Sequence, residues 1–168
     1  MATRRQRRPA RDRTRPGAFS SPACYLHEFE QASSGKPPAA AHGVGVKRIY
    51  EAPASDDGYR VLIDRLWPRG VSKERARLDA WLAQLAPSTA LRTWFHRDLK
   101  RWPEFTRRYR AELRGQRLLL QALRERARRQ RVTLLYAARD TRVNHATVLR
   151  AVLQRAPRAA TGPSAARA

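Results

Sequence analysis

Apolar residues in this chain follow two kinds of spacing, which predict strands in some segments and helices in others. Residues 60–64 and 132–136 each contain at least three consecutive apolar side chains. Short runs without polar alternation are typical of strands that are covered on both faces of a sheet. Residues 46–50 are predicted to form another short strand.

In the segments after residues 60–64, other than the run at 132–136, apolar residues recur every three or four positions, which is the spacing of one helical face. Ser72 and Ser88 are typical residues for a helix start, Pro103 suits a first turn, and Gly115 suits a helix end. Two later helices are predicted over residues 116–130 and 143–155. The helix from Ser72 to Pro87 is expected to present four apolar residues on one face: Leu78, Trp81, Leu82 and Leu85.

Strands separated by helices predict a parallel pair joined by a right-handed crossover. The expected fold is therefore α/β, a small parallel sheet flanked by helices, in a single compact domain over residues 46–156. Residues 1–45, a basic leader, and residues 157–168 have few large apolar groups to offset the entropy of ordering. We expect both tails to be disordered.

The formal net charge is +22, from 36 Lys and Arg against 14 Asp and Glu. Such a charge attracts nucleic acid, acidic headgroups or phosphorylated small molecules. The excess is nearly all Arg in a chain that is also rich in Ala and Pro, so the compositional bias of a GC-rich genome explains it equally well. Charge alone therefore does not select a partner.

Other residue types narrow the function classes. The single cysteine, Cys24, can form neither an internal disulfide nor a Cys-based zinc site, and it fits a cytoplasmic location. No apolar run has the length of a membrane span, and the N-terminus lacks the apolar region of a secretory signal. No pair of histidines has metal-binding spacing, and GxSxG and dinucleotide-binding motifs are absent. We expect neither a metal nor a cofactor, and the oligomeric state is left open.

Polar residues directly follow the first long apolar run. Asp64 and Arg65 could act as a base with its anchor, or could hold the polar groups of a ligand. They could equally be a structural ion pair. Arg69 and Gly70 precede the helix expected at Ser72, where free N–H groups suit a phosphate or carboxylate. The alternative is a Pro/Gly turn before a capped helix.

A second group follows the other run and contains Arg139, Asp140, Asn144 and His145 within seven residues. The positive end of a helix dipole disfavours protonation of His145, so a neutral imidazole could serve as general base or hydrogen-bond donor. Asp140 and Asn144 could instead be helix caps, and His145 could be a packing residue. Because ligands of α/β domains bind beyond the carboxyl ends of strands, both groups are expected at one site.

A different class of function is indicated by residues 97–131, which carry 13 cations against four acids. This segment could follow a phosphate backbone. Its aromatic residues Trp102, Phe105 and Tyr109 fall at helical core spacing, however, which favours inward-facing rings that cannot stack on bases. Nucleic-acid binding by a basic helical face therefore remains the alternative reading.

Four segments of the chain resemble the YeaO-like proteins, a family of small bacterial domains. They are IYEAPASDDGYRVLIDRLWPRGVSKE, LAPSTALRTWFHRD, WPEFTRRYRAEL and VTLLYAARDTRVNHATVL, within residues 46–154. The resemblance implies a soluble cytoplasmic α/β domain and supplies no reaction.

A broader branch of the superfamily resembles this chain but has a second strand that ends in a Cys-containing segment, followed by a Cys-His-Arg triplet. Tyr136 and Asn144 stand at the cysteine positions here, Ala146 replaces the arginine, and Asp140 and His145 are kept. The resemblance thus implies that thiol chemistry is not open to this chain.

These observations predict a site for a small anionic ligand, a phosphate ester or a carboxylate, at the carboxyl edge of the sheet. Arginine side chains would hold the anion in a bidentate manner. The expected ligand-binding residues are Arg65, Arg69, Arg139 and Asn144. If turnover occurs, His145 would transfer the proton with an aspartate, and the candidate catalytic residues are His145, Asp64 and Asp140.

Overall fold

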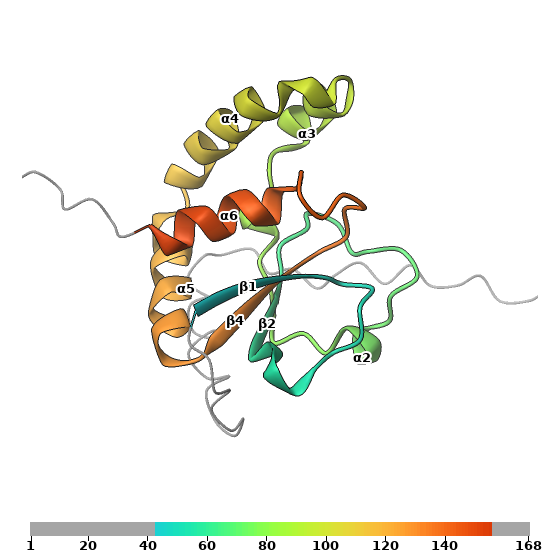
Figure 1. Cartoon of the computed structure of the whole chain (residues 1–168), viewed down its shortest axis with the longest axis vertical. Coiled ribbons are helices and arrows are strands. Elements are labelled where there is room, and N and C mark those ends of the chain that lie inside the picture. Colours follow the sequence, from blue (N-terminus) through green and yellow to red (C-terminus); the bar gives the residue numbers. More distant parts are fainter. Residues whose placement is uncertain (1–42, 156–168) are drawn as a thin grey trace, which may run out of the picture.

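The computed structural model describes residues 43–155. Residues 1–42 of the expected leader and the expected tail lie outside them, whereas residues 43–45, which were expected to be disordered, form the start of the first strand. Over residues 43–155 the chain forms a four-stranded sheet in the order β1-β4-β2-β3, with every neighbouring pair parallel (Figure 1). The strands are β1 (Gly43–Arg48), β2 (Tyr59–Leu62), β3 (Ala80–Trp81) and β4 (Arg131–Tyr136). The predicted α/β class and parallel sheet are confirmed.

The two long apolar runs are adjacent strands. β2 and β4 pair from Tyr59 opposite Val132 to Leu62 opposite Leu135, and the Ile63 N–H extends the pairing to the Leu135 carbonyl at 3.0 Å. Because the strands are parallel and in register, the residues that follow them emerge together. The loops after β2 and β4 therefore start side by side at the carboxyl edge of the sheet.

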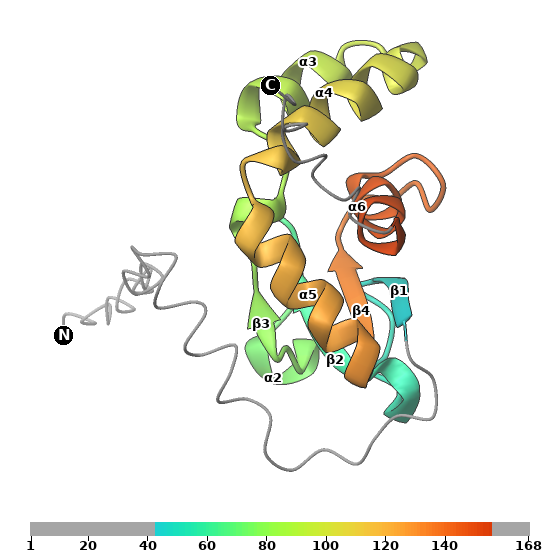
Figure 2. The ribbon, with the colours of Figure 1, turned by 90° about the vertical axis from the view of Figure 1, so that its left-hand side faces the viewer.

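Four of the predicted helices form close to their expected positions. They are α3 (Thr89–His96), α4 (Trp102–Arg114), α5 (Arg117–Arg129) and α6 (His145–Gln154). Ser88 caps α3 by accepting the Leu91 N–H at 3.1 Å, as its residue type predicts. Figure 2 shows α3 and α4 extending past the edge of the sheet toward which β4 points.

The prediction of one long helix from Ser72 to Pro87 is wrong. The segment forms a short α-helix, α2 (Lys73–Ala76), which ends at Arg77 in a left-handed conformation with φ 46°, and a 3-10 turn at Ala83–Leu85. Between them the chain pairs with β2, where the Leu82 N–H donates to the Leu62 carbonyl at 2.8 Å. Sheet pairing wins because it satisfies the backbone along the open edge of β2.

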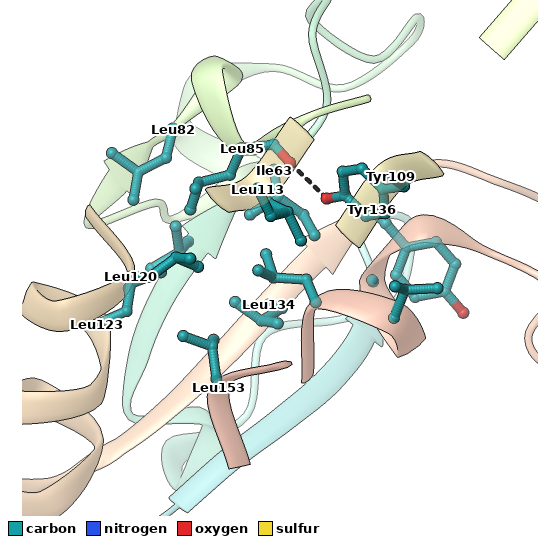
Figure 3. Close-up of a cluster of buried hydrophobic side chains, with 14 of the residues drawn as sticks. Ile63, Leu82, Leu85, Tyr109, Leu113, Leu120, Leu123, Leu134, Tyr136 and Leu153 are labelled. Carbon is teal, nitrogen blue, oxygen red and sulfur yellow. Dashed lines mark hydrogen bonds between the residues drawn. The ribbon is translucent and has the colours of Figure 1, made fainter. Parts of the chain in front are cut away.

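Side chains of the sheet alternate between two cores, which explains the uninterrupted apolar runs. Val61, Ile63 and Leu134 join the larger core with α3, α4, α5 and α6, while Leu62 and Leu135 join a smaller one with α2. Figure 3 shows the larger core, in which the buried hydroxyl of Tyr109 donates to the Leu85 carbonyl. This bond ties α4 to the segment after β3.

Candidate ligand pocket at the carboxyl edge of the sheet

A cleft of about 460 Å³ opens at the carboxyl edge of the sheet. It is lined by residues 64–69 after β2, by the segment from Ala137 to His145 in part, and by one side of α3 and the start of α4. Pockets of this size accommodate small organic molecules. The lining residues used below are Asp64, Arg65, Arg69, Arg92, Phe95, Trp102, Phe105, Asn144 and His145.

The base of this pocket is formed by Asp64, which follows β2, and by His145, the first residue of α6. One carboxylate oxygen of Asp64 accepts the Ala137 N–H at 2.7 Å, and the other lies 3.4 Å from Nε2 of His145. The indole of Trp81 donates to the backbone carbonyl of Asp64 at 2.7 Å. The sequence placed this pair at one edge, and the structure brings the two side chains together.

Burial controls the charge of Asp64. Removal from water raises the pKa of its carboxyl to about 6, although the Ala137 N–H and the positive field of Arg92 act in the opposite direction. Asp64 is therefore ionised at neutral pH but gains a proton in mildly acidic solution.

His145 is neutral over the same range, because burial lowers the pKa of its imidazole to about 4, opposed by the bond to the Ile63 carbonyl. Its Nε2 lies 3.2 Å from that carbonyl and 3.4 Å from Asp64. Since both neighbours are acceptors, Nε2 carries the proton and Nδ1 keeps its lone pair. The sequence argument expected a neutral imidazole from the helix dipole, whereas burial is the leading cause.

Three exposed arginines are among the residues that line the pocket: Arg65, Arg69 and Arg92, called the arginine rim below. Arg65 is loosely held by the carbonyls of Pro87 and Ala86 at 3.3 and 3.4 Å, which leaves most of its donors for a ligand. Sequence reasoning missed Arg92. It lies on α3 three residues before Phe95, and only the placement of α3 over the sheet edge makes it a lining residue.

Aromatic side chains close the opposite side of the pocket. Phe95 lies 4.5 Å from Phe105 and 5.8 Å from Trp102, measured between ring centroids, and Trp102 stacks on Phe105 at 5.4 Å. These three residues are called the aromatic wall below, and Trp102 and Phe105 were expected as core residues of their helix. Their packing supplies an apolar, aromatic side to the pocket.

Three other candidates have different environments. Arg139 and Asp140 are exposed and are not among the pocket residues. The Asp140 carboxylate accepts the Arg142 and Val143 N–H groups at 2.7 and 2.8 Å, which holds its pKa below the usual value. Asn144 is buried at the pocket, where its amide oxygen caps α6 through the Thr147 N–H at 3.0 Å and its amide nitrogen donates to the Asp140 carbonyl. Asn144 therefore has the helix-capping role that was its alternative, whereas Asp140 holds the loop before α6 and does not cap the helix itself.

Within residues 43–155, no three His, Cys, Asp or Glu side chains gather as a metal-binding group. Over the same residues, no helix combines the length and apolar character needed to cross a membrane.

Fold and pocket together define a small α/β domain with a pocket at the carboxyl edge of its sheet, the edge where such folds bind ligands. Residues 43–167 match the family described as the inactive DUF488-N3 subclade, and the chain belongs to this family.

Two relatives show how far the similarity extends. The uncharacterised protein YeaO of Escherichia coli is 44% identical over 103 residues, which is 61% of this chain and 90% of that protein. The uncharacterised protein Rv3073c of Mycobacterium tuberculosis is 42% identical over 110 residues, 66% of this chain and 92% of that protein. The resemblance to the YeaO-like proteins is confirmed. No solved structure matches the chain.

Proposed function

We propose that this protein binds a small organic anion, a phosphate ester or carboxylate, in the pocket at the carboxyl edge of the sheet. The observation that carries the proposal is a pocket lined by both the arginine rim and the aromatic wall. Guanidinium groups suit carboxylates and phosphates because their donors match paired oxygens. An apolar wall adds burial energy for the organic part of the same molecule.

Binding without turnover is the form of the proposal that the observations support best. The family is described as an inactive subclade. Of the three candidate catalytic groups, Asp140 lies outside the pocket and is occupied by loop N–H groups. Asp64 and His145 remain, and Nε2 of His145 is directed to two acceptors. Two of the three groups are thus engaged in holding the structure.

The proposal is tested by isothermal titration of phenyl phosphate into the full chain and two variants. Arg65→Gln and Arg92→Gln each remove one guanidinium from the arginine rim, and each should weaken binding about tenfold, the typical worth of a charge-assisted hydrogen bond. Arg139→Gln is the matched control, because it removes the same charge from an exposed position outside the pocket. An equal loss in all three variants would show non-specific attraction to a basic protein.

Nucleic-acid binding by the basic face of α4 and α5 stays a second proposal with weaker support. Exposed arginines such as Arg107, Arg114 and Arg128 line these helices, but Phe105 and Tyr109 are buried and cannot stack on bases. A mobility assay with single-stranded DNA at low and moderate salt separates the two ideas. Retention that falls steeply with salt and survives Arg65→Gln would favour this surface over the pocket.

A further inference from the structure

We infer that the ligand of this pocket presents a hydrogen-bond donor to Asp64, so that the site selects planar molecules with an N–H or O–H group at one end and a phosphate or carboxylate at the other. The inference rests on the proposed function and deepens it. It assigns the two ends of the ligand to the two polar regions of the pocket, and the flat part to the aromatic wall.

The hydrogen bonding of Asp64 is incomplete. A carboxylate offers about four acceptor positions, and Asp64 uses one at 2.7 Å with the Ala137 N–H and one weaker position at 3.4 Å from His145. Among residues 43–155, no Lys or Arg side chain lies within ion-pair distance of it. Its side chain is 18% exposed, and it lines the pocket. The remaining acceptor positions are therefore met from the pocket side.

The position of Asp64 decides which end of a ligand can approach it. An ionised carboxylate repels the oxygens of a phosphate or carboxylate, so an anionic group is kept away from the pocket base. Three guanidinium groups against this one carboxylate leave the pocket positive, which places the anion at the arginine rim. Only a donor group gains a favourable contact with Asp64 itself.

The aromatic wall determines the shape of the part between these ends. Trp102 and Phe105 are stacked with 16° between their ring planes, and Phe95 is tilted against both. Flat rings bury more area against such a surface than branched chains do, and offset or edge contacts between rings add about 1 kcal/mol. An aromatic body between the two ends of the ligand is therefore the shape that the aromatic wall favours.

The experiment compares two probes that differ in one group. Phenyl phosphate has the ring and the anion, and 4-aminophenyl phosphate adds an N–H donor at the far end of the ring. Titration into the full chain at pH 7.5, where Asp64 is ionised, should give about tenfold tighter binding of 4-aminophenyl phosphate, the ratio expected for one hydrogen bond to a charged acceptor. This comparison uses only the unmodified protein, so its result does not depend on whether a variant folds.

Two variants assign the preference to Asp64. In Asp64→Asn the amino compound should lose its advantage, so that both probes bind within about twofold of each other. Asp140→Asn is the matched control, since Asp140 is exposed and outside the pocket, and it should retain the full tenfold preference. Circular dichroism of both variants confirms that they are folded before titration.

The outcomes separate the inference from the function on which it rests. Measurable but equal binding of both probes to the unmodified chain would overturn the donor inference and leave the anion pocket standing. A preference that persists in Asp64→Asn would overturn the role of Asp64. Absence of binding by both probes would overturn the proposed function and the inference together.

Discussion

An aspartate lies at each end of the sheet, Asp57 buried and Asp64 partly buried, and the environments of the two carboxylates are opposite. At the amino end, Asp57 is enclosed by cations and N–H groups. At the carboxyl end, Asp64 has one short backbone bond and a neutral imidazole. The comparison shows how the degree of hydrogen-bond saturation distinguishes a structural carboxylate from one that faces a ligand site.

At the amino end the polar network is closed. Asp57 accepts from Lys47 at 2.9 Å, from the Ala54 N–H at 2.9 Å and from Arg60, with which it forms a buried ion pair. Arg60, only 2% exposed, also donates to the carbonyl of Ala76 at 2.9 Å. Burial opposes ionisation of Asp57, but these partners outweigh it and lower its pKa.

At the carboxyl end the same residue type has its pKa raised, because burial is not balanced by partners. Ionised Asp64 therefore destabilises the native protein at neutral pH, whereas ionised Asp57 stabilises it. A stability cost concentrated at one pocket is typical of binding sites, where the missing partner is the ligand.

The largest effect on stability is expected at the amino end of the sheet, where the Asp57 network lies. Asp57→Ala leaves Arg60 buried without its carboxylate, and we expect a loss of about 3–5 kcal/mol in the free energy of unfolding. Urea denaturation followed by circular dichroism measures it. Asp56→Ala is the matched control, because the neighbouring side chain is exposed and should change stability by less than about 0.5 kcal/mol. Similar midpoints for the two variants would contradict a structural role for the Asp57 network.

The next effect is a pair of opposite pH dependences at the carboxyl end. Asp64 has a pKa of about 6 against an ordinary 3.8, so the native state binds the extra proton between these values and stability falls as pH rises through them. His145 has a pKa of about 4 against 6.5, so the unfolded state binds the extra proton and stability rises with pH. In the unmodified chain the two contributions nearly cancel.

Single variants should reveal the separate contributions of Asp64 and His145 to the pH dependence of stability. As pH rises from 4 to 6.5, the free energy of unfolding of Asp64→Asn should increase by about 3 kcal/mol relative to the unmodified chain. That of His145→Gln should decrease by about 3 kcal/mol, since one pKa unit corresponds to about 1.4 kcal/mol. Unfolding free energies measured at half-unit pH steps give both curves. Parallel curves for the two variants would show that the pocket base does not titrate as the structure indicates.

Sequence patterns predicted the elements that local spacing determines. The runs of β2 and β4 are apolar on both faces because helices cover the larger core and α2 covers the smaller one. The helix predicted from Ser72 to Pro87 does not continue through Ala80–Leu85 for a physical reason. Leu82 and Leu85 face the larger core, while Leu78 and Trp81 face the smaller one. Apolar residues facing two cores produced a spacing that also fits one helical face.

The site was predictable only as far as strand ends determine it. Asp64 and His145 could be placed together because parallel strands deliver their following residues to one edge. Arg92 and Phe95 enter the pocket through the packing of α3 over that edge, which no local pattern encodes. Whether an arginine in a loop, such as Arg65 or Arg139, turns toward the pocket or toward solvent is equally a tertiary property.

The smallest effect is expected at Asn144 and tests whether this residue belongs to the binding site at the carboxyl end of the sheet. Asn144 lines the pocket, yet both ends of its amide are used, by the Thr147 N–H and the Asp140 carbonyl. Asn144→Ala should therefore cost about 1 kcal/mol of stability through the lost cap of α6, and should change the affinity for phenyl phosphate less than twofold. Asn144→Ser keeps a capping oxygen and should recover most of the stability. The prediction is contradicted if Asn144→Ala loses affinity tenfold and Asn144→Ser restores stability without restoring affinity. The Asn144 amide would then contact the ligand, and the binding site would extend to the start of α6.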